Sequence, residues 1–218
     1  MMEFPHFAEM MRRIRFVKSG PDTIQFAEDV ITHVIRQGGV EGPPAPMQAT
    51  PVNQSNAKMV ESGFKFGGKS NAELVGVLPI MVEVAELALR LSTQDFMIFD
   101  GLRTADEQRV LVAKGMSKTM NSKHLKQKDG YSHAFDAVPV VGSIPKWDWQ
   151  LIYPVAYAVD QAATALGVAD KIRWGGAWDR TLADFGGDVK AYEREVRLYC
   201  DRHPGKDFID GPHFEWIG

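Results

Sequence analysis

Three short segments, widely separated along the chain, carry histidine and carboxylate side chains in a pattern that suits a bound metal ion. They read SKH at 122–124, SHAFD at 132–136 and DGPHFEW at 210–216. Two histidines and one aspartate can fill three corners of a tetrahedral zinc site and leave the fourth for water, as catalytic zinc requires. A fold that builds such a site must bring residues 122–136 against the C-terminal segment.

The C-terminal segment offers both a ligand and a proton acceptor. Asp210 and His213, at i and i+3, would point to opposite faces of a regular strand. Gly211-Pro212 between them interrupts that regularity, so both side chains can converge on one point. Asp210 could then take a proton from a metal-bound water, although a single histidine in a terminal strand is more often structural than a ligand.

The other ligands are less determined by the residues alone. Asp136 lies in the apolar run Ala134–Val138, where a carboxylate is costly unless a metal or a buried arginine balances its charge. His124 and His133 compete for the remaining ligand position, and their spacing from Asp136 does not choose between them.

Composition excludes several classes of function. The net charge of -3 gives no reason to expect a nucleic-acid partner, and the single cysteine, Cys200, excludes an internal disulfide framework or a cysteine-based zinc cluster. No apolar run approaches the roughly 18–20 residues of a membrane span. The N-terminus lacks the apolar core of a signal peptide, so we expect a product that stays in the cytoplasm until something else releases it.

The N-terminal part of the chain differs in character from the rest. Apolar residues recur at helical spacing between Ile24 and Ile35, and Gly38-Gly39 ends the pattern. The sequence that follows is low in charge and rich in Pro, Gln, Asn and Ser, as linkers are. We therefore predict a helical N-terminal segment, a linker and a folded domain, over 1–37, 38–62 and 63–218.

Within the domain, helical and extended patterns mix without a regular repeat. Capping and periodicity signals predict four helices, over 79–91, 105–114, 151–166 and 188–202. The first should bury a stripe of Ile80, Val84, Leu87 and Leu91, and Pro154 falls in the first turn of the third. Strands are predicted at 96–99, 134–141, 172–174 and 208–217. This order favours an α+β fold with a small, mostly antiparallel sheet and flanking helices.

Several motifs occur in an order that resembles one known family. They are FKFGGKS, FDGLRT, KGMSKTMNSKHL, IRWGGAW and DGPHFE, which begin at residues 64, 99, 114, 172 and 210. Together they resemble the zinc peptidases of phage endolysins, which are grouped with D-Ala-D-Ala carboxypeptidases and vancomycin-resistance dipeptidases. The resemblance covers residues 64–218 and implies a D-Ala-D-Ala carboxypeptidase/hedgehog-like fold.

The resemblance also implies an activity, that of an L-alanyl-D-glutamate endopeptidase acting on peptidoglycan stem peptides with a zinc ion (Zn2+). Carried over position by position, it gives three zinc ligands and a catalytic base, namely His124, Asp136, His213 and Asp210. Arg103 matches the arginine that contacts the substrate and its developing oxyanion. Gln108 and Ser117 match positions near the substrate.

The chain departs from the family pattern between two of these ligands. The family usually reads Ser-x-His-x-x-Gly-x-Ala-x-Asp, whereas here Lys126–Gly130 looks like an insertion and Ser132 takes the glycine position. Charged, glycine-containing residues can loop out of the way. The insertion nevertheless leaves His133 as a substitute for His124.

Two further departures concern acidic residues. Asp100 replaces the glutamate that often precedes Gly-Leu-Arg, and the stretch over 179–207 looks longer than usual. Three carboxylates in that stretch could bind calcium or remain solvated, and these are Asp179, Asp184 and Asp188.

Other functions remain open. A D-Ala-D-Ala carboxypeptidase would carry the same centre, although the missing signal peptide counts against an exported enzyme. A non-catalytic cell-wall-binding or virion-associated module could keep a zinc-stabilised fold; the insertion favours it and the intact Asp210 opposes it. If Asp210 is not the base, Glu215 is the next candidate.

A phage lytic enzyme would accumulate in the cytoplasm of the infected host. We expect it to depend on a holin-type, pore-forming partner for release, to act on bacterial peptidoglycan and to be a monomer.

Overall fold

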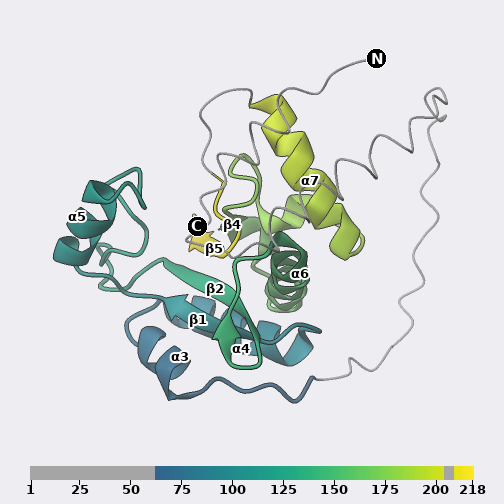
Figure 1. Cartoon of the computed structure of the whole chain (residues 1–218), viewed down its shortest axis with the longest axis horizontal. Coiled ribbons are helices and arrows are strands. Elements are labelled where there is room, and N and C mark those ends of the chain that lie inside the picture. The colour runs from purple at the N-terminus through teal and green to yellow at the C-terminus, as the bar shows by residue number, and fades with distance from the viewer. Residues whose placement is uncertain (1–61, 204–208) are drawn as a thin grey trace. The chain divides into compact units, whose positions relative to one another are not determined.

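The computed structural model describes residues 62–203 and 209–218. The helical segment predicted over 1–37 lies outside these residues, as does all of the predicted linker except Ser62. The division of the chain into segment, linker and domain therefore stays a prediction. The described residues contain both helices and strands (Figure 1), as expected of an α+β fold.

A small antiparallel sheet forms the centre of the domain. Its strands are β1 (Phe96–Asp100), β2 (Ala134–Val141), β5 (His213–Trp216) and β4 (Ile172–Trp174), in that spatial order, and every neighbouring pair is antiparallel. A short strand, β3 (Ile144–Pro145), pairs with the end of β2. The predicted fold class, a small antiparallel sheet with flanking helices, is confirmed.

Helices cover this sheet (Figure 1). α4 (Pro79–Leu91) and α6 (Trp149–Ala165) pack against each other, and their buried side chains join those of β1 and β2 in one core. α7 (Val189–Arg202) packs on α6, and α3 (Gly68–Glu73) packs on β1. None of the described helices is long and apolar enough to cross a membrane.

The buried face of α4 differs slightly from the predicted stripe. Its fully buried residues are Met81, Val84, Ala85, Ala88 and Leu89. Ile80, Leu87 and Leu91, which the stripe included, are only partly buried. Two alanines on the buried face leave room for a neighbouring helix, and a search for large apolar residues misses that signal.

α6 begins earlier than predicted. Its first residue is Trp149 rather than Leu151, because the carboxylate of Asp148 caps the helix by accepting from the N–H of Gln150 at 2.9 Å. Pro154 therefore lies inside the helix and not in its first turn. Two short 3-10 helices follow α6, η1 (Ala169–Lys171) and η2 (Leu182–Asp184).

α5 (Ala105–Ala113) stands apart from the other helices. It begins with the predicted capping box, in which the Thr104 hydroxyl accepts from the N–H of Glu107 and the Glu107 carboxylate accepts from the N–H of Thr104. Gly115, with a φ of 66°, follows its end. Gln108 is the one buried residue of α5, and Figure 1 shows this helix projecting on the side away from α6 and α7.

Candidate metal centre and active site

The sheet register places three charged side chains in one row. Asp100 on β1 lies opposite Asp136 on β2, and Asp136 lies opposite His213 on β5. Opposite residues of antiparallel strands project from the same face, so Asp136 and His213 point to the same side. The pairing of β1 with β2 is irregular between Ile98 and Asp100, as often occurs next to active sites.

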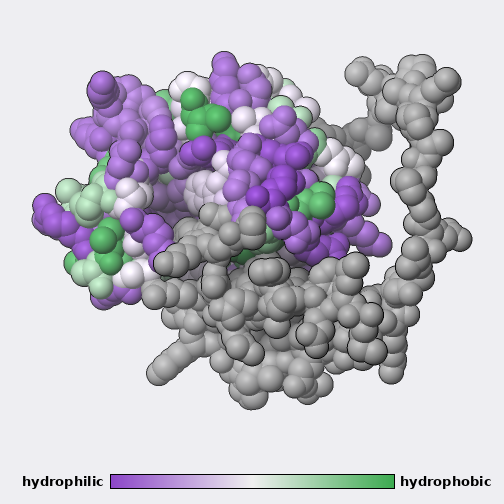
Figure 2. All heavy atoms as spheres, turned by 90° about the horizontal axis from the view of Figure 1, so that it is seen from above, coloured by the Kyte–Doolittle hydropathy of each residue, from purple (hydrophilic) through white to green (hydrophobic). Residues whose placement is uncertain are grey.

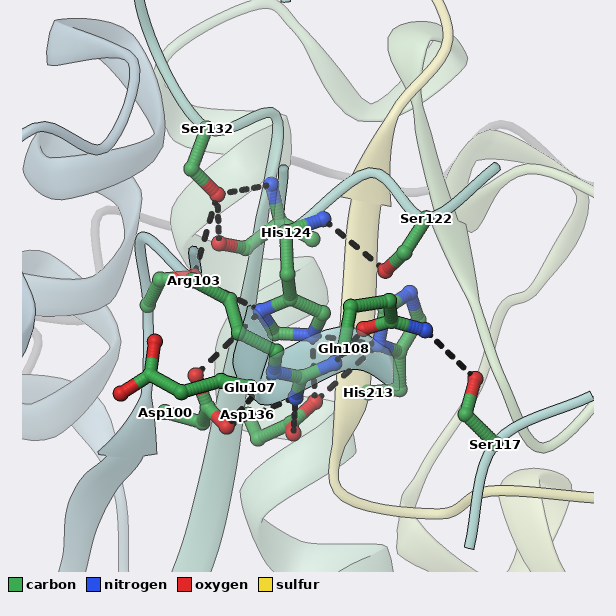
Figure 3. Close-up of polar contacts among 12 residues, drawn as sticks. Asp100, Arg103, Glu107, Gln108, Ser117, Ser122, His124, Ser132, Asp136 and His213 are labelled. Atoms are coloured by element: carbon green, nitrogen blue, oxygen red, sulfur yellow. Dashed lines mark hydrogen bonds and ion pairs between the residues drawn. The ribbon is translucent and has the colours of Figure 1, made fainter. Parts of the chain in front are cut away.

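His124 joins this row from the segment after α5. The N–H of Arg103 donates to the carbonyl of His124 at 2.9 Å, and a bridge between Arg103 and Leu125 continues the pairing. His124 is buried. The backbone pairing therefore delivers its ring to Asp136 and His213 (Figure 3).

Three potential ligand atoms converge at this point. Nε2 of His124 lies 3.2 Å from Oδ1 of Asp136 and 3.1 Å from Nδ1 of His213, and the last two atoms are 3.0 Å apart. Ligands about 2.0–2.1 Å from a tetrahedral zinc ion are spaced about 3.3 Å from one another. The triangle thus has the size of one face of a zinc site.

Hydrogen-bond partners assign the tautomer of each histidine. Nδ1 of His124 lies 2.8 Å from the carbonyl oxygen of Gly101, which can only accept, so Nδ1 carries the hydrogen. Nε2 of His213 lies 3.2 Å from Oε2 of Glu215 and donates in the same way. In neutral rings the two remaining nitrogens, Nε2 of His124 and Nδ1 of His213, carry lone pairs. These lone pairs face each other and Oδ1 of Asp136. Three converging acceptors repel one another unless a proton or a metal cation lies between them, and two imidazoles with one carboxylate form a ligand set that fits zinc.

The electrostatics of the cluster point the same way. Burial alone would lower the pKa of His213, but its hydrogen bonds to Asp136 and Glu215 raise that pKa to about 10. Burial would raise the pKa of Asp136, but His124 and His213 hold it far below its usual range. Without a metal, a proton on His213 supplies the positive charge, so a metal ion that binds there must displace it.

His133 has different surroundings. Its Nε2 lies 2.7 Å from Oδ2 of Asp129, and this hydrogen bond lowers the pKa of the Asp129 carboxyl. The two histidines that spacing left as alternatives are therefore separated by the structure: His124 faces Asp136 and His213, whereas His133 faces a loop carboxylate.

Residues 126–130, which look like an insertion beside the family pattern, form a short loop that closes at its base. The N–H of Gln127 donates to the carbonyl of Tyr131 at 2.8 Å, and Lys126 forms an antiparallel bridge with Ser132. Ser132, at the position where the family has glycine, is fully buried. Because the loop closes on itself, the residues on either side of it still meet.

Asp210 stands in a turn that precedes β5. The N–H of His213 donates to the carbonyl of Asp210 at 3.1 Å, so the chain turns before the strand begins. The strand predicted over 208–217 is therefore reduced to His213–Trp216. Gly175 packs so closely here that a Cβ on it would lie 2.3 Å from the Asp210 carbonyl oxygen, which explains the glycine at that position.

The side chain of Asp210 lies within electrostatic reach of the cluster. Burial and the negative charge of Asp136 raise the pKa of Asp210 to about 6, against the opposing effects of His213, His124 and Arg103. A carboxyl group with a pKa near neutral is suited to accept a proton and to return it.

Arg103 is fixed beside the cluster by two partners. Its Nε and Nη2 donate to Oδ2 of Asp100 at 3.0 and 2.7 Å, and its Nη1 donates to Oε1 of Gln108 at 2.7 Å (Figure 3). Nη2 also lies 3.8 Å from Oδ2 of Asp136. Asp100, although shorter than the glutamate often found there, thus anchors the guanidinium at the edge of the cluster.

Gln108 and Ser117, both predicted to lie near the substrate, contact each other. Nε2 of Gln108 donates to Oγ of Ser117 at 2.8 Å and to the carbonyl oxygen of Thr119 at 2.6 Å. Gln108 is completely buried, whereas Ser117 is partly exposed. Substrate contacts by these residues stay predictions, and the burial of Gln108 favours a different role.

Glu215 has partners that the sequence reasoning missed, since it considered this residue only as an alternative base. Its Oε2 accepts from His213 and its Oε1 accepts from Arg173. Burial would raise the pKa of Glu215, but these two partners lower it to about 2. The signal was available, because residues i and i+2 of a strand face the same side, and Glu215 follows His213 at that spacing.

The three loop acids considered for calcium each have a partner of their own. Asp179 pairs with Arg202, Asp184 accepts from Thr181, and Asp188 caps α7 by accepting from the N–H of Ala191. These contacts account for the acids without an ion.

Comparison with known proteins places the domain in a family. The family described as phage L-alanyl-D-glutamate peptidase matches residues 62–217. The L-alanyl-D-glutamate peptidase of Escherichia phage T5 is 33% identical over 128 residues, which are 58% of this chain and 90% of that protein. The crystal structure of the Serratia marcescens L-Ala D-Glu endopeptidase ChiX matches with 29% identity and a TM-score of 0.49, covering 70% of this chain and 90% of ChiX. Because the family match spans most of the length of this chain, the chain belongs to the phage L-alanyl-D-glutamate peptidase family.

Proposed function

We propose that this protein is a zinc-dependent endopeptidase that hydrolyses the L-Ala–D-Glu bond of peptidoglycan stem peptides. Family membership supports the choice of bond, since the family and the phage T5 relative are named for it. The observation that carries the chemistry is the convergence of three acceptor atoms, from His124, Asp136 and His213, whose charges act on the buried Asp210 carboxyl.

In this proposal His124, Asp136 and His213 hold the zinc ion. When bound, zinc would lower the pKa of a coordinated water toward about 7 and so supply a nucleophile near neutral pH. Asp210 would act as the general base, accepting a proton from the attacking water, and then as the general acid, returning it to the leaving amine of D-Glu. Arg103, held at the edge of the cluster, stabilises the negative charge that develops on the scissile carbonyl oxygen.

The biological setting is proposed by analogy with phage lytic enzymes. We propose a monomer that stays in the cytoplasm of the infected host until a holin-type partner opens a path to the cell wall. The polymeric substrate, bacterial peptidoglycan, is the partner that the family membership supports most directly.

Purified peptidoglycan treated with the protein is expected to release peptides that begin with D-Glu. Hydrolysis of the L-Ala–D-Glu bond leaves a new amino terminus on that residue, and a zinc chelator should stop the release because it removes the ion. Mass spectrometry of the soluble products, with chelator, without it, and after zinc is added back, measures both effects.

Other products would change the assignment. Free D-Ala would identify a D-Ala-D-Ala carboxypeptidase. Release of nothing from several wall types by zinc-loaded protein would favour a non-catalytic cell-wall-binding or virion-associated module. If D-Glu peptides were still released in the presence of the chelator, the assigned cleavage site would stand and the proposed zinc dependence would be wrong.

Glu215→Gln is expected to weaken zinc binding by roughly 10- to 100-fold, the usual cost of altering the partner of a metal-bound histidine. The amide is a poorer acceptor for Nε2 of His213, and it loses the ion pair with Arg173. Competition with a chromophoric chelator measures the affinity. Asp129→Asn alters a carboxylate–histidine pair outside the cluster and is the matched control; equal affinities for both variants would show that Glu215 does not support the ligand.

A further inference from the structure

We propose that Gln108 is a positioning residue, which acts through Arg103 and does not contact the substrate. The inference rests on the proposed function, because Arg103 is assigned there to the developing negative charge. It replaces the direct substrate contact that the family resemblance implies for Gln108 with a role inside the protein.

The first observation is that Gln108 has no N–H donor left for a ligand and is completely buried. A carboxamide has two N–H donors, and both are used, one for Oγ of Ser117 and one for the carbonyl of Thr119. Its oxygen accepts from Nη1 of Arg103 at 2.7 Å. The side chain is 0% exposed, so a substrate could reach it only by displacing one of these partners.

The orientation of the amide is fixed by the chemistry of its neighbours. The guanidinium of Arg103 can only donate, so the amide oxygen must face it. The carbonyl of Thr119 can only accept, so the amide nitrogen must face that side. A flipped amide would set two donors against each other and two acceptors against each other.

The second observation concerns the helix that carries Gln108. α5 has no other fully buried residue. Leu111 and Val112 are only partly buried, and three further apolar residues on and after the helix are exposed, with Val110 49%, Met116 49% and Met120 42% exposed. Figure 2 shows hydrophobic residues exposed among hydrophilic ones at the left end of the described part, the side on which α5 lies in Figure 1. The one fully buried side chain of α5 is therefore polar, and its hydrogen bonds tie the helix to Arg103 and to the segment after α5.

Arg103 needs such a partner. Asp100 holds one edge of the guanidinium, through Nε and Nη2, and Gln108 holds the remaining nitrogen, Nη1. With both partners the plane of the group is defined before substrate binds, and a preorganised donor costs no reorganisation during the reaction. With Asp100 alone, the guanidinium keeps its ion pair but loses the contact that fixes Nη1.

Kinetics of Gln108→Met on a soluble stem peptide test this role. Methionine has a similar length but forms no comparable hydrogen bonds, so we expect kcat to fall roughly 10- to 100-fold, the scale of a small misplacement of a catalytic group. KM should change less than about threefold, because ground-state binding does not use Gln108. Val110→Ala, an exposed change on the same helix, is the control and should leave both constants unchanged.

A double-mutant cycle separates positioning from direct contact. If Gln108 acts through Arg103, Gln108→Met should cost less than about threefold in an Arg103→Met background. A raised KM with unchanged kcat, or the same loss in both backgrounds, would overturn the proposal. Should Gln108→Met fail to fold, Gln108→Leu serves instead, because leucine also lacks hydrogen-bonding groups, and the pattern expected in the two Arg103 backgrounds is the same as for Gln108→Met.

A measurement without turnover keeps the inference distinct from the proposed function. The Nη1 protons of Arg103, one of which is donated to Gln108, should give a slowly exchanging NMR signal in the wild-type protein, which Gln108→Met broadens while Val110→Ala does not. An unchanged signal in Gln108→Met would overturn the positioning role. If wild-type protein cleaved no stem peptide, the proposed function would fail, and this signal would still decide whether Gln108 positions Arg103.

Discussion

Asp210→Asn is expected to bind zinc as the wild type does and to hydrolyse stem peptides roughly 10²- to 10⁴-fold more slowly, the usual contribution of a positioned general base. The substitution preserves the shape of the side chain and removes the one function that the mechanism requires of it. The turn that holds residue 210 depends on backbone hydrogen bonds and on Gly175, and the variant leaves both intact. Single-turnover kinetics and zinc content measured on one preparation check both halves of the prediction.

The control is Asp179→Asn, which removes a loop carboxylate that pairs with Arg202. The logarithm of its turnover should stay within a few tenths of the wild-type value. An exposed ion pair usually contributes only about 0–1 kcal/mol to stability, so its loss should not disturb the active site. Near-normal turnover by Asp210→Asn would mean that the base is misassigned. Glu215 would then be the candidate, although its contacts with His213 and Arg173 already occupy both carboxylate oxygens.

Local signals predicted the starts of α4 and α5 and the limits of β2 and β4 correctly, but missed the start of α6 and the limits of the last strand. The capping box at Thr104 and the proline at residue 79 lie where the structure begins α5 and α4, because a cap acts between residues adjacent in sequence. The last strand was predicted too long, since its start depends on a turn that is packed against Gly175. Strand order and register also depend on contacts between distant residues, so only the class of the sheet was accessible.

For the site, the residue types indicated which side chains could bind a metal together. Which of them actually meet depends on the register of the strands. The sequence could not separate His124 from His133, because the intervening loop has no fixed geometry until Lys126 pairs with Ser132. The i, i+2 spacing of His213 and Glu215 was readable in principle. The internal hydrogen bonds of Gln108 could not be predicted, because a sequence does not reveal how many hydrogen bonds a polar side chain already makes.

His124→Ala and His133→Ala form the most discriminating pair of variants, because one chemical change is made at two candidate positions. His124→Ala removes a nitrogen that lies 3.2 Å from Asp136 and 3.1 Å from His213. We expect zinc affinity to fall by more than about 100-fold, because loss of a direct ligand should exceed the roughly 10- to 100-fold cost of altering an outer-shell partner. Turnover should fall below detection at zinc concentrations that saturate the wild type.

His133→Ala should keep zinc affinity and turnover close to wild type. The hydrogen bond of the His133 ring is to the Asp129 carboxylate in the loop, and not to a residue of the metal cluster. Zinc content and hydrolysis of stem peptides, measured for both variants after dialysis against the same free zinc, give the comparison. The opposite pattern, with metal and activity kept in His124→Ala and lost in His133→Ala, would make His133 the ligand and would require the 126–130 loop to rearrange when metal binds. Loss of zinc in both variants would instead mean that the loop pair supports the position of His124, which lies on the other side of the insertion.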